Sequence, residues 1–216
     1  NAILGYAEMM REAVYGVLNV RQTGVMERIE SSSKRLLGMV SDLLDQAQLE
    51  AGHMRIFKSE FKTSDLIDAV HTMLDKEFED KGLALKVELD PRMPATLRGD
   101  SHRLQQILLN LTGNAIKFTE KGEVDVRIFR ADPDLWGTEG SDTGPGIPSD
   151  AQQYIFESFR QADNVTTRKH GGIGLGLAIV RSLVQVLGGK ITLKSKVGEG
   201  TNFTVILPFA HTKEEK

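Results

Sequence analysis

One stretch of the chain decides the fold, and it reads Asn110-Leu-Thr-Gly-Asn114-Ala-Ile-Lys117-Phe118. Asn110, Asn114 and Lys117 are spaced i, i+4, i+7, so a helix would carry two amides and one ammonium on a single face. This face suits an anionic ligand with a hard metal ion, because amide oxygens can ligate Mg²⁺ and lysine can pair with phosphate. A solvated polar face is the alternative for the helix taken alone. The other face is apolar and predicted to enter the core: Leu104, Ile107, Leu108, Leu111 and Ala115.

Three glycine-rich segments follow this helix in the chain. Each permits a backbone geometry, or a close ligand approach, that a Cβ atom would block. A single segment of this kind is weak evidence, but three of them in this order after an Asn-x-x-x-Asn helix are specific. They read Asp142-Thr-Gly144-Pro-Gly146-Ile147, His170-Gly-Gly172-Ile173-Gly174-Leu175-Gly176-Leu177 and Gly198-Glu-Gly200-Thr201.

Together the four segments resemble the N, G1, G2 and G3 boxes of the ATP-binding region of sensor histidine kinases, within the GHKL superfamily that also contains DNA gyrase. The stretch Phe156-Glu-Ser-Phe159-Arg-Gln161 resembles the F box of that family. The resemblance covers roughly residues 1–208. It implies an α+β fold, a GHKL-type α/β sandwich with helices on one face of a mixed sheet, preceded by an α-helical hairpin. It also implies an enzyme, a protein-histidine kinase that moves the γ-phosphoryl of ATP to a His for relay to the Asp of a response-regulator receiver domain.

The resemblance implies roles for single residues. Asn114 would be the protein's Mg²⁺ ligand, with Asn110 beside the same metal and Lys117 at the phosphates. Asp142 suits the adenine amino group because an ionised carboxylate only accepts hydrogen bonds, and a turn-forming Asx residue is the alternative. Phe118 and Ile147 would line the adenine pocket. The ATP-binding residues implied in this way are Asn110, Asn114, Lys117, Phe118, Asp142, Gly144, Gly146, Ile147, Gly172, Ile173, Gly174, Leu175, Gly176, Leu177 and Thr201.

A helix is predicted over 173–187, directly after the second glycine segment. Free N–H groups and the helix dipole at its start would attract phosphate. A flexible loop is the alternative, but it would not lead into an amphipathic helix. The segment has no Gly-Lys-Ser/Thr and follows no strand directly, so it is neither a P-loop nor a nicotinamide fingerprint. Residues 160–170 would form a lid in which Arg160, Arg168 and Lys169 could neutralise phosphate, although such residues are more often solvated.

Residues 1–52 lack strand signals and predict a helical hairpin. Its first helix has an apolar stripe that runs from Ile3 to Val14, and Gly52 would end the second. From Met26 to Ala47 apolar residues alternate by three and four, with one polar break at Ser33, which is a heptad seam. Two helices with one narrow seam bury little surface, so we expect a homodimer; packing onto the following domain is the alternative.

We therefore expect a dimerisation and phosphotransfer hairpin over 1–52, a catalytic ATP-binding domain over 53–210 and a disordered tail over 211–216. In the second domain, Ser64 is expected to cap a helix that runs to about Lys81. A short helix is expected near 150–156. Strands are predicted over 83–89 and 124–129, with a neighbour over 135–141 and a closing hairpin of 190–195 and 201–207.

Composition excludes several classes of function. A net charge of −3 leaves no nucleic-acid footprint. The absence of Cys excludes disulfides, thiol catalysis and Cys-ligated zinc. No apolar run reaches the length of a membrane span. Because the chain begins inside a helical pattern at Asn1, we expect it to be a cytoplasmic piece of a longer protein whose membrane or sensory part lies upstream.

Three features depart from the family pattern. None of the five His residues is followed by Asp or Glu or lies on the first helix, so the phosphoacceptor His is absent and no catalytic residue is assigned. Thr138 and Gly140 occupy inward positions of a buried strand, where an aliphatic residue fits best. Ile173 stands where the family often has a hydroxyl residue.

Two alternative functions remain open on these residues. One is a GHKL ATPase, although its general-base carboxylate is expected in the Asn helix, where this chain has Gln105 and Gln106. The other is a non-catalytic dimeric scaffold that holds nucleotide.

Overall fold

The computed structural model describes residues 2–160 and 174–210 of the 216-residue chain. It divides into two compact units, Asn1–Ala51 and Gly52–Lys216, each considered by itself below. The tail over 211–216 lies outside the described residues, and so do four residues with an expected role at the nucleotide: Arg168, Lys169, Gly172 and Ile173.

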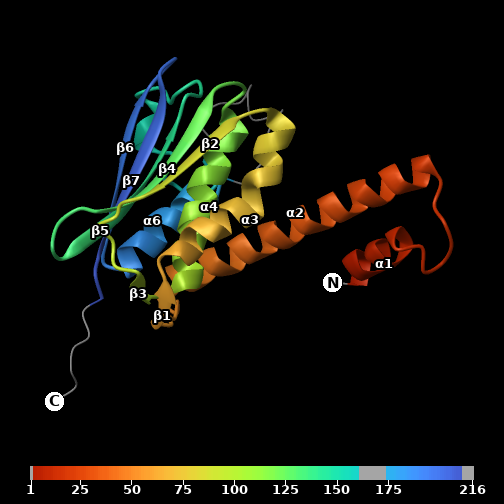
Figure 1. Ribbon diagram of the computed structural model, residues 1–216, viewed down its shortest axis with the longest axis horizontal. Helices are drawn as coiled ribbons and strands as arrows, with labels where there is room; N and C mark the ends of the chain where they lie inside the picture. Colours follow the sequence, from red (N-terminus) through yellow and green to blue (C-terminus); the bar gives the residue numbers. More distant parts are fainter. Residues whose placement is uncertain (1, 161–173, 211–216) are drawn as a thin grey trace. The chain divides into compact units, whose positions relative to one another are not determined.

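The first unit is a helical hairpin of α1 (Ala2–Arg11) and α2 (Val20–Glu50) (Figure 1). A capping box starts α2: the Asn19 side chain accepts from the N–H of Gln22 at 3.0 Å, and the Gln22 side chain accepts from the N–H of Asn19. An ion pair of 3.1 Å between Arg11 and Glu30 joins the two helices. The predicted hairpin is therefore confirmed.

The first helix is shorter than predicted and ends at Arg11, so Val14 is not part of its apolar stripe. Ala13 has a φ of 59° and Gly16 a φ of 112°, and both values turn the chain out of the helix. Val14 is 59% exposed as a result. The predicted stop of α2 is correct, because Gly52 adopts a φ of 67° just after the last turn.

A five-stranded mixed sheet forms the second unit, with the strand order β2-β4-β5-β7-β6. In this sheet β2 and β4 run parallel, whereas β4 with β5, β5 with β7 and β7 with β6 run antiparallel. A separate two-stranded sheet pairs β1 with β3. The strand bounds are Ser59–Lys62 (β1), Ala84–Leu89 (β2), Thr96–Gly99 (β3), Glu123–Arg130 (β4), Leu135–Asp142 (β5), Lys190–Lys196 (β6) and Gly200–Pro208 (β7).

Helices α3 (Ser64–Lys81), α4 (Ser101–Phe118) and α6 (Gly176–Val186) cover one face of the large sheet and leave the other face open (Figure 1). The strands alternate accordingly: Val124, Val126 and Ile128 of β4 are at most 2% exposed, whereas the residues between them point to the open face. The predicted apolar face of α4 is buried as expected. This architecture confirms the predicted α+β fold with helices on one face.

Two helix starts in the second unit, and the extent of one short helix, differ from the predictions. Thr63, not Ser64, occupies the N-cap of α3, and its hydroxyl donates to Pro94 O instead of capping the helix. The short helix is a single 3-10 turn, η1 (Ala151–Gln153). Helix α6 begins at Gly176, because Gly174 adopts a left-handed φ of 78° that no helix allows.

Strand β5 carries the unusual residues in the expected orientation. Thr138 is 3% exposed, and its hydroxyl has no hydrogen-bond partner among the described residues. A Cβ atom on Gly140 would lie 3.9 Å from Cβ of Leu111. The structure adds a glycine that the sequence did not mark. A Cβ atom on Gly137 would lie 2.6 Å from Val205 O, so no side chain fits there. Within the described residues, no helix is long and apolar enough to cross a bilayer.

Candidate functional site

Helix α4 presents the polar stripe that the sequence predicts. Asp100 caps its N-terminus, where the carboxylate accepts from the N–H of Arg103 at 3.1 Å. Asn110, Asn114 and Lys117 are half-buried on the face opposite the core. The Lys117 ammonium lies 4.9 Å from the centroid of the Phe118 ring. The stripe is thus partly withdrawn from water, as a ligand site on a helix face requires.

The N-terminus of α6 meets this stripe. A Cβ atom on Gly176 would lie 3.1 Å from Oδ1 of Asn110, so the glycine lets the two helices approach closely. Among the described residues no side chain caps α6, whose N-cap is Leu175, and its first turn holds no acidic residue. The N–H groups of that turn therefore keep the positive end of the helix dipole beside an amide of α4. The side chain of Leu175 is 1% exposed, so at this site it can offer only its backbone.

The C-terminal end of α4 meets the first glycine segment. A Cβ atom on Gly144 would lie 2.8 Å from Oδ1 of Asp142 and 3.4 Å from Phe118 O. Between Asn110 and Phe118 a helix rises by about 12 Å. The site is therefore an elongated strip along α4, with a glycine approaching the helix at each end.

Asp142 ends β5 as a partly desolvated acceptor. Burial raises the pKa of its carboxyl above the ordinary value, and hydrogen bonds from the N–H groups of Gly144 and Thr201 oppose that shift. The bond from Gly144 measures 2.8 Å and closes an Asx turn, so the turn-forming alternative is also seen. A carboxylate has about four acceptor positions. The Asp142 carboxylate can therefore accept a further hydrogen bond from a ligand.

The first and last glycine segments are joined through Ser195, which sequence reasoning missed. The N–H of Ile147 donates to Ser195 Oγ at 2.8 Å, and Ser195 Oγ lies 2.9 Å from Gly200 O and 3.0 Å from Thr201 Oγ1. The Gln152 amide donates to both Ile147 O and Ser195 O. The available sequence signal was a polar residue at an inward position of β6, after Ile191 and Leu193.

Lys81 is a second residue that the sequence did not indicate. Its ammonium, in the last turn of α3, donates to three carbonyls at the C-terminus of α4: Ile116 O at 2.5 Å, Lys117 O at 3.1 Å and Thr119 O at 3.4 Å. A cation there satisfies carbonyls that the helix leaves unpaired and complements its dipole. Lys81 thereby holds the turn that carries Lys117 and Phe118.

Several predicted site residues have other partners or lie outside the described residues. Arg160 pairs with Glu157 at 3.1 Å and lies over the Tyr154 ring, so it is engaged locally. The N–H of Phe159 donates to Gly174 O at 3.1 Å, which connects the F-box segment with the start of the α6 region. The expected contributions of Gly172 and Ile173 fall outside the described residues.

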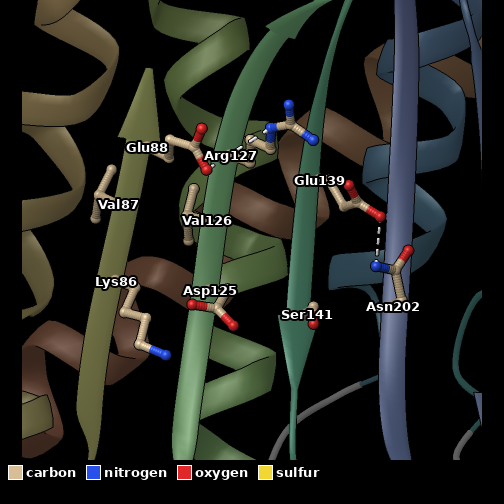
Figure 2. Close-up of a pocket in the computed structure, with 9 residues that line it drawn as sticks. All are labelled: Lys86, Val87, Glu88, Asp125, Val126, Arg127, Glu139, Ser141 and Asn202. Carbon is tan, nitrogen blue, oxygen red and sulfur yellow. Dashed lines mark hydrogen bonds and ion pairs between the residues drawn. The ribbon is translucent and has the colours of Figure 1, made fainter. Parts of the chain in front are cut away.

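A shallow hollow of about 420 Å³ lies elsewhere, on the open face of the sheet (Figure 2). Its charged groups largely face one another. Arg127 pairs with Glu88 at 3.8 Å, and Asn202 donates to Glu139 at 2.6 Å. None of the predicted nucleotide residues that the structure describes lines it, so we regard it as a solvated polar surface.

Comparisons with known proteins agree with this geometry. Residues 99–211 match the family of histidine kinase-, DNA gyrase B- and HSP90-like ATPases, and residues 1–52 match the His kinase A (phospho-acceptor) domain. The chain is 38% identical to the autoinducer 2 sensor kinase/phosphatase LuxQ of Vibrio cholerae over 96% of its length, covering 24% of LuxQ. It is 37% identical to the signal transduction histidine-protein kinase BarA of Escherichia coli over 94% of its length, covering 22% of BarA.

Solved structures show the same similarity. Full-length ShkA in complex with AMPPNP is 32% identical, with a TM-score of 0.79, and the match covers 97% of this chain and 43% of ShkA. The Acinetobacter baumannii histidine kinase AdeS shares the fold at 19% identity, with a TM-score of 0.69 over 97% of this chain and 95% of AdeS. The chain spans about a quarter of the length of LuxQ and BarA. The chain belongs to the family of histidine kinase-, DNA gyrase B- and HSP90-like ATPases, and within it to the sensor histidine kinases.

Proposed function

We propose that the second unit binds Mg²⁺-ATP along α4, with adenine at Asp142 and the phosphates at the N-terminus of α6. The observation that carries this proposal is the approach of one glycine to each end of the α4 stripe, at Gly144 and Gly176. A half-buried acceptor lies at the first end, and at the second lies a helix N-terminus that no described side chain caps. These groups match the amino group and the phosphates of ATP, respectively.

Mg²⁺ would be held by the Asn114 amide together with phosphate oxygens and water. This ion favours six oxygen ligands and takes few of them from protein when a nucleotide is present. Within residues 2–160 and 174–210 no group of three or more His, Cys, Asp or Glu side chains could hold a metal by itself. When bound, the ion would neutralise charge that develops on the phosphates, while Lys117 and backbone N–H groups position them.

In the longer protein, we propose transfer of the γ-phosphoryl from ATP to a His on a helical hairpin, and then to an Asp of a response-regulator receiver domain. The match of residues 1–52 to a phospho-acceptor domain, next to an ATPase domain, supports this order. Catalysis would consist mainly of positioning and charge neutralisation, because phosphoryl transfer needs little covalent chemistry from the protein.

Thermal melts with and without Mg²⁺-ADP test nucleotide binding. A ligand at ten times its Kd stabilises a protein by about 1.4 kcal/mol, which corresponds to a rise in Tm of about 3–5 °C for a chain of this size. An unchanged Tm at millimolar nucleotide would contradict the proposal.

Incubation with γ-labelled ATP distinguishes the kinase from its rivals. The chain should label a separately supplied His-bearing hairpin slowly, because the tether that raises the effective concentration is missing. Release of labelled phosphate without transfer would indicate an ATPase instead. Binding without either reaction would indicate a scaffold.

We also propose that α2 pairs with a second copy of this chain. Leu36, Val40 and Leu43 of the predicted seam are 58%, 46% and 44% exposed, which leaves an apolar stripe exposed along α2. Such a stripe at heptad spacing is typical of a helix with a partner.

Replacing both Leu36 and Leu43 by Lys would place charge in that seam and should convert dimers to monomers, while Mg²⁺-ATP binding is retained. Light scattering measures the mass. Ser31→Lys with Ser41→Lys is the matched control, because it adds the same charge at exposed positions away from the seam. The proposal fails if the wild-type chain is monomeric at all concentrations, or if both double variants dissociate it equally.

A further inference from the structure

A row of three polar side chains crosses the end of the large sheet on the face that the helices cover. Ser195 of β6 pairs directly with Thr201 of β7, and Thr201 pairs directly with Asp142 of β5. Directly paired residues place their side chains on the same face. Thr201 is 8% exposed and faces inward in line with Phe203 and Val205. The three groups are therefore neighbours within the site.

The protons of this row can be assigned from its hydrogen bonds. The N–H of Ile147 donates to Ser195 Oγ at 2.8 Å. Ser195 Oγ lies 2.9 Å from Gly200 O, and a carbonyl only accepts, so the single Ser195 proton belongs to that bond. The contact of 3.0 Å between the two hydroxyls then requires Thr201 to be the donor. Ser195 thus accepts two hydrogen bonds and donates one.

This assignment determines what Thr201 can offer to a ligand. A hydroxyl has one proton, and Ser195 takes that of Thr201, so only acceptor lone pairs of Thr201 remain. Beside it, the Asp142 carboxylate accepts as well. Two neighbouring acceptors suit an amino group, which donates two hydrogens, and they repel a carbonyl oxygen.

We propose that Ser195 is a specificity-determining residue. It selects a 6-amino purine over a 6-oxo purine because its Oγ accepts the hydrogen bond of the Thr201 hydroxyl, which leaves Thr201 only as an acceptor. This inference rests on the proposed placement of adenine at Asp142. Ser195 acts through Thr201 and need not touch the base. Without the Ser195 hydroxyl, Thr201 could turn its proton toward a 6-oxo group and accept that base.

The test compares ATP with inosine triphosphate, which carries an oxo group at position 6 and a proton on the adjacent ring nitrogen. Titrations with Mg²⁺ present give the ratio of the two Kd values. The wild type should bind ATP at least about tenfold more tightly, and Ser195→Ala should reduce the ratio by about tenfold, since one hydrogen bond is gained or lost. Ser195→Thr retains a hydroxyl and should restore the ratio.

The ratio of the two Kd values distinguishes a change in base selectivity from a general loss of nucleotide affinity. Ser195→Ala also removes the acceptor of the Ile147 N–H, which should weaken both nucleotides by the same factor. Thr192→Ala is the matched control, because it removes a hydroxyl of the same strand whose contact is with Thr204 O on the open face. An unchanged ratio in a folded Ser195→Ala protein overturns the inference.

A second variant keeps the test valid if Ser195→Ala does not fold. Thr201→Val removes the hydroxyl that Ser195 orients, so it should also lower the ratio of the two Kd values. In the Thr201→Val background, Ser195→Ala should then cause no further change in that ratio. Independent, additive effects of the two substitutions would contradict the proposal. A wild type that binds no Mg²⁺-ATP overturns the proposed function and this inference together, whereas ATP binding with an unchanged ratio overturns only the inference.

Discussion

Asp142→Asn is expected to weaken Mg²⁺-ATP binding by about 10- to 100-fold, the usual value of one hydrogen bond to a charged acceptor. The carboxylate already accepts from the N–H of Gly144 at 2.8 Å. An amide that keeps this bond turns its NH₂ toward the adenine amino group, and donor then faces donor. An amide that flips loses the bond to Gly144 instead. Either orientation forfeits one hydrogen bond of the complex.

The same substitution should stabilise the nucleotide-free protein at neutral pH. Burial raises the pKa of Asp142, so the folded state holds its proton at pH values where the unfolded state has already lost it. The stability of the wild type therefore falls as pH rises from the ordinary carboxyl range through the raised pKa, and the full cost remains above it. Asn does not titrate and should escape this loss.

Two measurements check this prediction. Titration calorimetry gives the ATP affinity, and thermal melts from mildly acidic to neutral pH give the difference in Tm between variant and wild type. That difference should increase with pH. Asp68→Asn, an exposed position on α3, is the control and should change neither quantity. Equal ATP affinity in Asp142→Asn and the wild type would show that adenine lies elsewhere.

Asn114→Ala is expected to remove the Mg²⁺-dependent part of ATP affinity, a loss of about 10- to 100-fold in the presence of the metal. Asn114 is half-buried on the stripe, one helical turn from the Asn110 amide that meets Gly176. Alanine favours a helix interior, so α4 should remain intact and the effect should be local.

Binding titrations with Mg²⁺ and with EDTA decide this prediction. The two curves should differ in the wild type and coincide in Asn114→Ala. Asn202→Ala is a suitable control, because that amide lies on the open face of the sheet, where it donates to Glu139. If Asn114→Ala keeps the whole difference between Mg²⁺ and EDTA, another group ligates the metal.

Helix and strand placement followed from periodicity wherever one face of an element is buried. The apolar stripe of α4 predicted its buried residues, because burial on one side of a helix imposes a period of 3.6 on the sequence. The strand predicted over 124–129 shows the corresponding period of 2 in its burial. Periodicity is less informative about the residues at which a helix or strand begins and ends. Helix α1 stops at Arg11 because Ala13 leaves the helical region, and Thr63 occupies the N-cap position expected for Ser64 while its hydroxyl bonds to Pro94 O. Competing turn and tertiary hydrogen bonds decided these ends.

Within the candidate site, the sequence by itself determined the residues whose chemistry is local: the amides of α4, the carboxylate that ends β5 and the glycines that approach α4 closely. Only the tertiary structure decided the partners. Ser195 joins Ile147 across 48 residues of chain, and Lys81 reaches the carbonyl of Ile116 across 35. The presence of a hydroxyl or an ammonium group in the sequence does not identify its hydrogen-bond partner, because hydrogen bonds between distant segments depend on strand register and helix packing. The spacing of residues along one helix or strand specifies neither the register nor the helix packing.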